Sequence, residues 1–274
     1  PKFKQAIEVL KPRMIISVFP TCAQFAARYK RDRQDVKTIT VLTDVVDSWE
    51  WIHPLTDMYC VPAEYVKQRL IEKEIPSERI FITGIPVKKG FIPAIENQGF
   101  QYPIAKVNFK RKRVLILGSA MGKFSLKHKT IDTMSRMPYD FTVVAGQDTA
   151  LYDKLYSMQL PENFTLIGYT DAIAQLMKES DLIITKPGGA TIFEAIESNL
   201  PLLIQPTNVG QEARNREFVE RYGFGDSYLD ADELVRKIDG LLADEDYSEA
   251  IKRNMRTFKA QSQWSTVFTT LGKW

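Results

Sequence analysis

Short runs of apolar residues alternate with amphipathic stretches along almost the whole chain. The runs predict nine strands, at residues 13–19, 36–43, 57–62, 79–84, 113–118, 140–146, 164–169, 181–186 and 201–206. Most of the intervening stretches have helical periodicity, as in residues 62–74 and 170–180. Strands that alternate with helices in this way are typical of parallel sheets linked by crossover helices. The pattern therefore predicts a doubly wound α/β fold.

The alternation is interrupted once, between residues 88 and 112, where prolines, glycines and charges break any period. We therefore predict two Rossmann-like domains at 1–92 and 113–250, a linker at 93–112, and a C-terminal helix at 251–274 that crosses back. The first unit has four predicted strands, opens within a helix and has no glycine before Gly84. Because the glycine-bearing first turn of a Rossmann-type domain is missing, we expect this N-terminal domain to be incomplete.

The composition is that of a globular protein, with 44% apolar and 26% charged residues among 274. A net charge of +3 is too small to indicate a nucleic-acid partner. The two cysteines fit a reduced, cytoplasmic protein, and no run approaches the roughly 20 apolar residues needed to span a bilayer. The basic run at residues 109–113, FKRKR, is compatible with an anionic membrane surface and equally with a solvated linker.

In open α/β sheets, ligands bind beyond the carboxyl ends of the strands. The most informative strand end is the run Pro187-Gly188-Gly189-Ala190-Thr191, which leads directly into a predicted helix. Two glycines let backbone N–H groups approach an anion, and the helix N-terminus adds a partial positive charge. The run suits a diphosphate. Its spacing matches neither the Walker A pattern nor G-x-G-x-x-G, which disfavours ATP hydrolysis and NAD binding.

A purely structural interpretation also fits this run. Pro-Gly-Gly could be a tight connection, and Thr191 with Glu194 forms a T-x-x-E pattern that predicts a capping box. After the next strand, Gly210 precedes another helix, and Gln211, Glu212 and Asn215 in its first turn offer hydrogen-bonding groups for hydroxyls. Helix capping and a solvated face would also explain these residues. Two adjacent strand ends, one suited to phosphates and one to hydroxyls, favour a nucleotide sugar.

Two long segments resemble one enzyme family. The segment DLIITKPGGATIFEAIESNLPLLIQPTNVGQEARN, at residues 181–215, closely resembles the donor-binding segment of glycosyltransferase family 28. The branch is that of bacterial diacylglycerol glucosyltransferases and plant monogalactosyldiacylglycerol synthases. The segment TDVVDSWEWIHPLTDMYCVPAEYVKQRLIEKEIPSERIFITGIPV, at residues 43–87, resembles the same glycolipid branch. A more distant relative is the transferase that adds N-acetylglucosamine to the peptidoglycan lipid precursor.

The resemblance implies a GT-B fold, in which two Rossmann-like domains face a cleft. It implies an inverting hexosyltransferase of glycolipid biosynthesis that moves glucose or galactose from UDP-glucose or UDP-galactose to a diacylglycerol-type lipid. Such an enzyme would be cytoplasmic and peripheral on the inner face of the cell membrane, with no cofactor. We expect no metal, because the short acidic run at residues 244–246 is predicted to be a solvated loop and the chain has two histidines.

The family's binding residues can be transferred position by position. The backbone around Gly168 and Tyr169 would meet the uracil, the turn 188–191 the diphosphate, Glu194 the ribose, and Gln211 and Glu212 the sugar. The acceptor side would contain Asp44, Trp51 and His53. The full set of candidate donor-binding residues is Gly118, Ser119, Gly168, Tyr169, Pro187, Gly188, Gly189, Ala190, Thr191, Glu194, Gly210, Gln211, Glu212 and Asn215.

The sequence also departs from the family pattern. The catalytic histidine of the family lies in an N-terminal glycine-rich loop that nothing here matches, so we expect the base upstream of this chain and no sugar transfer by this chain alone. Asp47 and Ser48 stand where another family histidine is common, and Val209 replaces a proline. The alternatives are a peptidoglycan-type N-acetylglucosaminyltransferase, a UDP-sugar epimerase, or a non-catalytic UDP-sugar-binding module.

Overall fold

The computed structural model describes residues 2–92, 111–118, 127–205, 207 and 210–273. The chain divides into two compact units. The first consists of Pro1–Pro86 and Phe258–Trp274, and the second of Val87–Thr257. Each contains its own parallel sheet.

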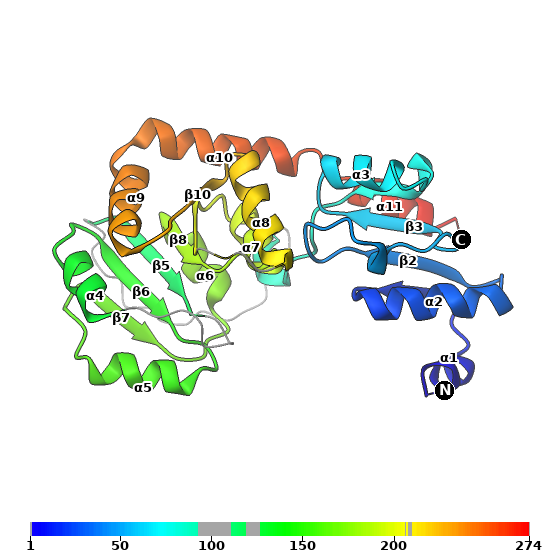
Figure 1. Cartoon of the computed structure of the whole chain (residues 1–274), viewed down its shortest axis with the longest axis horizontal. Helices are drawn as coiled ribbons and strands as arrows, with labels where there is room; N and C mark the ends of the chain where they lie inside the picture. The colour runs from blue at the N-terminus through cyan, green and yellow to red at the C-terminus, as the bar shows by residue number, and fades with distance from the viewer. Residues whose placement is uncertain (1, 93–110, 119–126, 206, 208–209, 274) are drawn as a thin grey trace. The chain divides into compact units, whose positions relative to one another are not determined.

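The first unit is built on a four-stranded parallel sheet in the order β1-β2-β3-β4 (Figure 1). Its elements are α1 (Lys2–Leu10), β1 (Met14–Ser17), α2 (Pro20–Asp32), β2 (Lys37–Val41), the 3-10 turn η1 (Trp49–Trp51), β3 (Met58–Val61), α3 (Glu64–Ile71), η2 (Ser77–Arg79), β4 (Ile80–Ile82) and α11 (Trp264–Leu271). Side chains alternate between the two faces of a strand. On one face, Ile39 and Val41 pack with Met58, Cys60 and Val267 of α11.

The second unit is built on a six-stranded parallel sheet in the order β10-β9-β8-β5-β6-β7. Its elements are η3 (Lys89–Phe91), β5 (Arg113–Leu117), α4 (His128–Ser135), β6 (Asp140–Val144), α5 (Thr149–Ser157), β7 (Phe164–Ile167), α6 (Ile173–Lys178), β8 (Leu182–Thr185), α7 (Gly189–Glu197), β9 (Leu202–Ile204), α8 (Gly210–Arg221), β10 (Gly225–Ser227), α9 (Ala231–Ala243) and most of α10 (Glu245–Lys259).

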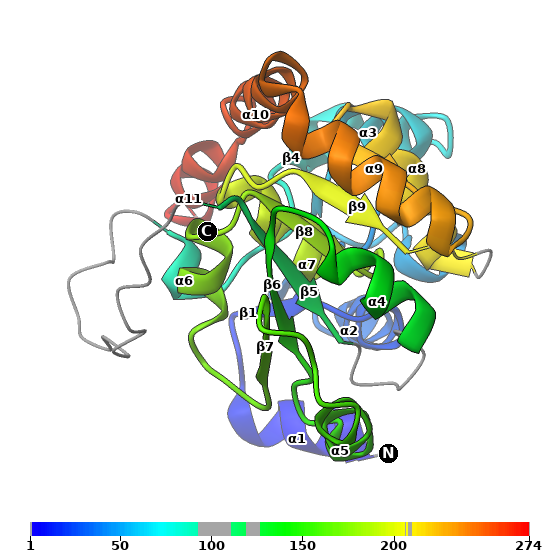
Figure 2. The same cartoon turned by 90° about the vertical axis from the view of Figure 1, so that its left-hand side faces the viewer.

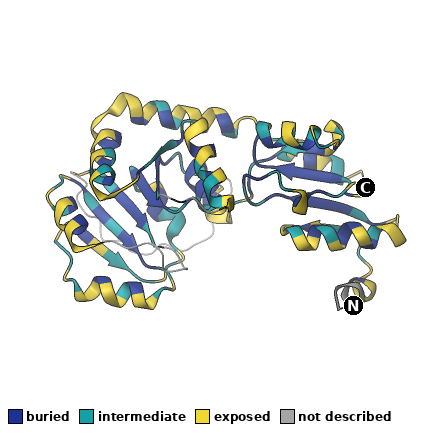
Figure 3. Cartoon of the chain, viewed as in Figure 1, coloured by how far each residue is buried: buried dark blue, intermediate teal, exposed yellow. Residues whose placement is uncertain are grey.

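Helices cover both faces of this second sheet. α4 packs against α9 on one face, and α7 packs against α8 on the other (Figures 1 and 2). The strands between them are buried, as the dark blue segments of Figure 3 show. Strands buried on both faces read in sequence as continuous apolar runs, which explains why the pattern of this chain predicts them well.

All nine strands predicted from the sequence are present, and the α/β class is confirmed. A tenth strand, β10, was not predicted. Its three residues, Gly225-Asp226-Ser227, carry no apolar side chain and are half-buried. β10 forms because its backbone pairs with β9, with Gly225 opposite Leu202.

We predict that Gly225→Ala strongly destabilises the second unit. A Cβ at Gly225 would lie 1.8 Å from the carbonyl oxygen of Leu202 and 2.8 Å from its amide nitrogen. The backbone of β9 cannot yield as a side chain can, so we expect a loss of about 3 kcal/mol or more in the free energy of unfolding. Urea denaturation followed by circular dichroism would measure it.

Gly240→Ala is the matched control. Gly240 lies within α9, and a Cβ there would meet nothing within 4 Å. Alanine favours a helix over glycine by about 1 kcal/mol, so this variant should be as stable as the wild type or more so. Equal stability of Gly225→Ala and the wild type would contradict the close β9–β10 approach.

Candidate functional site

The turn between β8 and α7 has the geometry of an anion-binding helix start. α7 begins at Gly189, and its N-cap, Gly188, has an extended backbone and no side chain to cap the helix. The Gly188 N–H donates to the Lys186 carbonyl oxygen over 2.8 Å, which tightens the turn. The first N–H groups of a helix have no intrahelical acceptor. They are therefore the donors that this turn can offer to an anion.

The capping box predicted from Thr191 and Glu194 is wrong. It requires Thr191 to precede the helix, whereas α7 starts at Gly189 and places Thr191 inside the first turn. The same start places Glu194 in the second turn, too far along the helix to bond the backbone of the N-cap. The structural interpretation of Glu194 as a helix cap therefore fails.

Glu194 is a buried carboxylate in an otherwise apolar helix. Glu194 is 7% exposed. The neighbouring residues on α7 are buried as well, namely Ile192, Phe193, Ala195 and Ile196. Burial raises the pKa of Glu194 above its usual value, and the positive charge of Lys88 opposes part of this shift. Within the described part of the chain, no side-chain hydrogen bond reaches this carboxylate. A buried carboxylate with free acceptor atoms is suited to the hydroxyls of a ligand.

The start of α8 lies next to this turn, because Thr185 at the end of β8 is in register with Ile204 at the end of β9. Gly210 begins α8 with φ at +45°, a left-handed conformation that favours glycine. Gln211 is exposed at the surface, while Glu212 is half-buried and accepts a hydrogen bond from the Thr207 hydroxyl over 3.2 Å.

Asn215 connects α8 to the glycine turn. The residue is 1% exposed, and its side-chain amide donates to the Pro187 carbonyl oxygen over 2.9 Å. Pro187 is buried too. The sequence placed Asn215 among the donor-binding residues, and the structure shows it holding the turn that carries them.

Sequence reasoning missed Lys186 at this site. The residue directly follows β8, and its ammonium lies 3.8 Å from the Glu212 carboxylate. The strand predicted at residues 181–186 includes this lysine as its last residue. The signal that could have found it is its position, one residue before Pro-Gly-Gly at a strand end.

The other predicted strand ends are held by packing and hydrogen bonds. A Cβ at Gly118 would lie 2.8 Å from Leu151 Cδ2 and 3.0 Å from the Val144 carbonyl oxygen, so crowding alone explains this glycine. Gly168 accepts a hydrogen bond from the Gly146 N–H over 3.3 Å. Tyr169 is 63% exposed, and its hydroxyl donates to Asp171. Ser119 lies outside the described residues.

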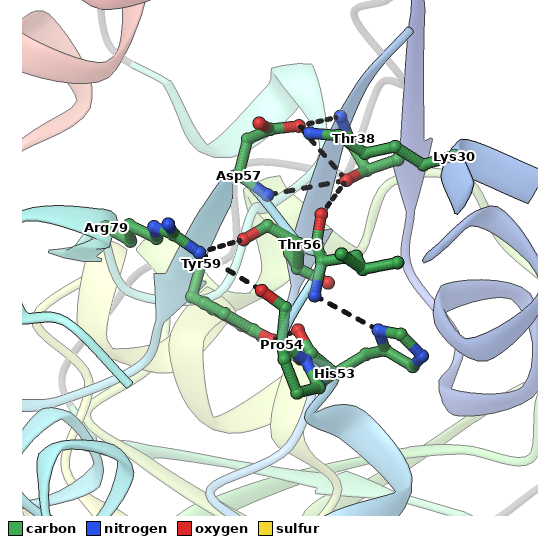
Figure 4. A network of polar contacts seen from close by, with 9 residues as sticks. Lys30, Thr38, His53, Pro54, Thr56, Asp57, Tyr59 and Arg79 are labelled. Atoms are coloured by element: carbon green, nitrogen blue, oxygen red, sulfur yellow. Dashed lines mark hydrogen bonds and ion pairs between the residues drawn. The ribbon is translucent and has the colours of Figure 1, made fainter. Parts of the chain in front are cut away.

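On the first unit, the candidate residue His53 is held by the loop around it (Figure 4). The backbone N–H of His53 donates to the Tyr59 hydroxyl over 2.8 Å, and that hydroxyl donates to the His53 carbonyl oxygen over 2.7 Å. His53 Nδ1 accepts from the Leu55 N–H over 3.1 Å. Burial lowers the pKa of His53, and the charges of Arg31 and Arg28 lower it further. These effects favour the neutral imidazole, and because Nδ1 accepts the Leu55 N–H, its proton lies on Nε2.

The same network fixes the rest of the loop (Figure 4). Arg79 donates to the Pro54 carbonyl oxygen over 3.1 Å. The Asp57 carboxylate accepts from the Thr38 N–H over 2.8 Å and forms an ion pair with Lys30. These contacts join α2, β2 and the start of β3, and give the loop around His53 a defined shape.

The two other acceptor-side candidates differ in exposure. Asp44 is half-buried after β2, and its carbonyl oxygen accepts from the Val46 N–H. Trp51 is 1% exposed and belongs to the core, so its ring is not presented at the surface. The exposed indole of this segment is Trp49, with the Lys73 ammonium 5.6 Å from its ring centre.

The described basic residues at 109–113 are engaged with the protein. Arg111 lies 3.9 Å from Asp140, Lys112 lies 3.7 Å from Glu245 and donates to the Leu242 carbonyl oxygen, and Arg113 lies 3.1 Å from Glu179. Phe109 and Lys110 fall outside the described residues.

The described residues contain no helix that is both long and apolar enough to cross a bilayer. They also contain no group of three or more His, Cys, Asp or Glu residues arranged to hold a metal ion.

Comparison with solved structures shows the GT-B fold. The glycosyltransferase of kitacinnamycin matches 98% of this chain and 78% of its own, with a TM-score of 0.74 and 14% identity. The UDP-GlcNAc 2-epimerase from Neisseria meningitidis bound to UDP-GlcNAc matches 99% of this chain and 79% of its own, with a TM-score of 0.71 and 18% identity. MurG from Acinetobacter baumannii matches 95% of this chain and 73% of its own, with a TM-score of 0.66 and 13% identity. At these identities the likeness concerns the fold alone.

Comparison of sequences identifies the family. A processive diacylglycerol beta-glucosyltransferase from Bacillus pumilus is 28% identical over 97% of this chain and 70% of its own length. The corresponding protein from Bacillus subtilis is 29% identical over 92% of this chain and 66% of its own length. Residues 1–87 match the family model of monogalactosyldiacylglycerol (MGDG) synthase, and residues 120–265 match that of the glycosyltransferase family 28 C-terminal domain. The chain thus belongs to glycosyltransferase family 28, in its diacylglycerol glycosyltransferase branch.

Proposed function

We propose that the second unit binds a UDP-hexose at the ends of β8 and β9, and that the protein transfers the hexose to a diacylglycerol-type lipid. The observation that carries the donor part is Glu194, a buried carboxylate to which no described residue donates a hydrogen bond, beside an uncapped, glycine-bearing helix start. The acceptor part is supported by the relatives named diacylglycerol glucosyltransferases and by the MGDG synthase match.

In this proposal the diphosphate lies at the N-terminus of α7. The unpaired N–H groups of the first turn and the partial positive charge of the helix stabilise negative charge there. The glycines at 188 and 189 let a phosphate oxygen approach the backbone, since a Cβ on Gly188 would meet only the Thr191 hydroxyl, at 3.9 Å. We propose that this helix start stabilises the departing UDP without a metal ion.

The nucleoside and the sugar lie on either side of the diphosphate. Glu194 accepts hydrogen bonds from the ribose hydroxyls, and the backbone at Gly168 and Tyr169 meets the uracil. Gln211 and Glu212 at the start of α8 bind the hexose hydroxyls. Both side chains can bond either C4 epimer, so glucose and galactose are both compatible with the site.

The reaction is a single displacement. The lipid hydroxyl oxygen forms a bond to the anomeric carbon, the bond from that carbon to the β-phosphate oxygen breaks, and UDP leaves with the electron pair. A base takes the hydroxyl proton. A diacylglycerol acceptor resides in a bilayer, so we propose that the protein works at a membrane surface. The lipid acceptor supports this contact better than the basic cluster does, because Lys112 donates to the Leu242 carbonyl oxygen and Arg113 pairs with Glu179.

We predict that Glu194→Gln weakens UDP binding by about tenfold or more. Hydrogen bonds to a charged group contribute about 1.5–3 kcal/mol each, and the amide forms a weaker and partly mismatched contact with the ribose. Isothermal titration calorimetry with UDP would measure the change. The control is Glu217→Gln, which neutralises an exposed carboxylate on α8 in the same unit. This variant should bind UDP as the wild type does. Unaltered affinity in Glu194→Gln would remove Glu194 from the site.

The raised pKa of Glu194 predicts a pH-dependent stability effect. The folded protein binds the Glu194 proton more tightly than the unfolded chain does. The free energy of unfolding is therefore not reduced by this group below the usual carboxyl pKa. It falls as the pH rises from there through the raised pKa of the folded state. Without ligand, Glu194→Gln should therefore be more stable than the wild type at pH 8, and the difference should disappear at about pH 4. Thermal melts across this range would show it, and a pH-independent difference would contradict it.

We predict that Asn215→Ala both destabilises the protein and weakens UDP binding. The buried Pro187 carbonyl oxygen loses its donor, which costs about 1–3 kcal/mol, and the glycine turn loses its anchor to α8. Urea denaturation and calorimetry would measure the two effects. Glu217→Ala, an exposed change on the same helix, should alter stability by less than about 0.5 kcal/mol and leave the affinity for UDP unchanged. Wild-type UDP affinity in a folded Asn215→Ala protein would count against this role.

A further inference from the structure

Lys186 is a largely buried cation beside the glycine turn. Its side chain is 17% exposed, and its carbonyl oxygen accepts the Gly188 N–H, so its backbone is fixed to the turn. Lysine side chains are mostly exposed, so an ammonium largely withdrawn from solvent needs partners. The surroundings of the ammonium therefore indicate what it binds.

The protein pairs this ammonium only loosely. Lys186 Nζ lies 3.8 Å from Glu212 Oε1, whereas charge-assisted N–H···O bonds span about 2.7–2.9 Å. The other Glu212 oxygen accepts from the Thr207 hydroxyl. Among the described residues, no side chain or carbonyl group accepts a hydrogen bond from Lys186 Nζ. Three N–H donors in a mostly buried place are thus free to bind an anion.

The relative burial of the two partners favours this interpretation over a surface ion pair. Glu212, at 39% side-chain exposure, is the more open partner, and Lys186 is the more enclosed one. Lys186 also lies two residues before Gly188, in the segment that leads to the helix start where the diphosphate is proposed to bind. An ammonium there would add a full charge to the partial charge of α7.

We propose that Lys186 binds the β-phosphate of a nucleoside diphosphate, and that Glu212 holds the ammonium in position at the mouth of the site. This proposal rests on the proposed function, because it concerns the same donor site. The site then distinguishes a nucleoside diphosphate from a monophosphate by one charged contact, while the N–H groups of α7 serve either ligand. Lys186 becomes a donor-binding residue, and Glu212 both positions it and faces the hexose.

The test compares UDP with UMP in the wild type and in Lys186→Met, which keeps most of the length of the side chain and removes its charge. We expect Lys186→Met to weaken UDP binding by about tenfold or more, since one hydrogen bond to a charged group contributes about 1.5–3 kcal/mol. Binding of UMP should change by much less. Lys186→Arg should recover part of the UDP affinity. A structural role alone would not alter the UDP-to-UMP ratio.

Two controls separate the possible explanations. Lys129→Met removes an exposed lysine from α4 and the same net charge, and should bind UDP as the wild type does. In a Glu212→Gln background, Lys186→Met should still weaken UDP binding. If the effect of Lys186→Met vanishes there, Lys186 serves only to neutralise Glu212 and the inference is wrong. Equal loss of UDP and UMP affinity, or wild-type UDP affinity in folded Lys186→Met, would overturn it as well.

The same experiment separates this inference from the proposed function. Absence of UDP binding by the folded wild-type protein would contradict the donor site itself. Binding of UDP by the wild type with an unchanged UDP-to-UMP ratio in Lys186→Met would leave the donor site in place and remove Lys186 from it.

Discussion

The position of β8 between β5 and β9 is the constraint on which the candidate donor site depends. Because all three strands are parallel, their carboxyl ends meet at one edge of the sheet. The ladder between β8 and β9 continues one residue beyond the strands, where the Gln205 N–H donates to the Thr185 carbonyl oxygen over 2.8 Å. The loops that follow therefore start side by side. This register brings the glycine turn before α7 next to the first turn of α8, although more than 20 residues separate them in sequence.

Glu194 shows how a cost in stability can indicate a function. The buried side of α7 is apolar apart from this carboxylate, and a leucine or glutamine there would avoid the desolvation of a charge. Helix capping does not explain the residue, because the helix starts at Gly189. A ligand with hydroxyl groups would supply the missing donors and recover the lost solvation. The local conflict between burial and charge is therefore the feature expected of a binding site, where fold stability is exchanged for recognition.

The sequence predicted the strands well and the details of the site less well, for identifiable reasons. Strands such as β8, buried on both faces, appear as uninterrupted apolar runs, while β10 has only backbone pairing to define it. The T-x-x-E spacing of Thr191 and Glu194 is the same in a capping box and within a helix, so only the position of the helix start could decide. Likewise, Trp49 and Trp51 lie two residues apart in one 3-10 turn, and packing alone determines which ring is buried.

Two helices share the recognition of the donor at this site, one through its backbone and the other through its side chains. α7 contributes backbone N–H groups and a partial charge, which bind phosphate without regard to the rest of the ligand. α8 contributes side chains: Asn215 holds the turn through Pro187, and Glu212 lies beside both the Lys186 ammonium and the proposed hexose position. All of these residues belong to the second unit. Donor binding should therefore be a property of that unit's own fold, whereas transfer to a lipid also needs a base and an acceptor site. A change at Gln211 can alter which sugar is bound without altering how the diphosphate is held. Changes at Asn215 or Glu212 act on both, because Asn215 holds the glycine turn and Glu212 lies beside the Lys186 ammonium.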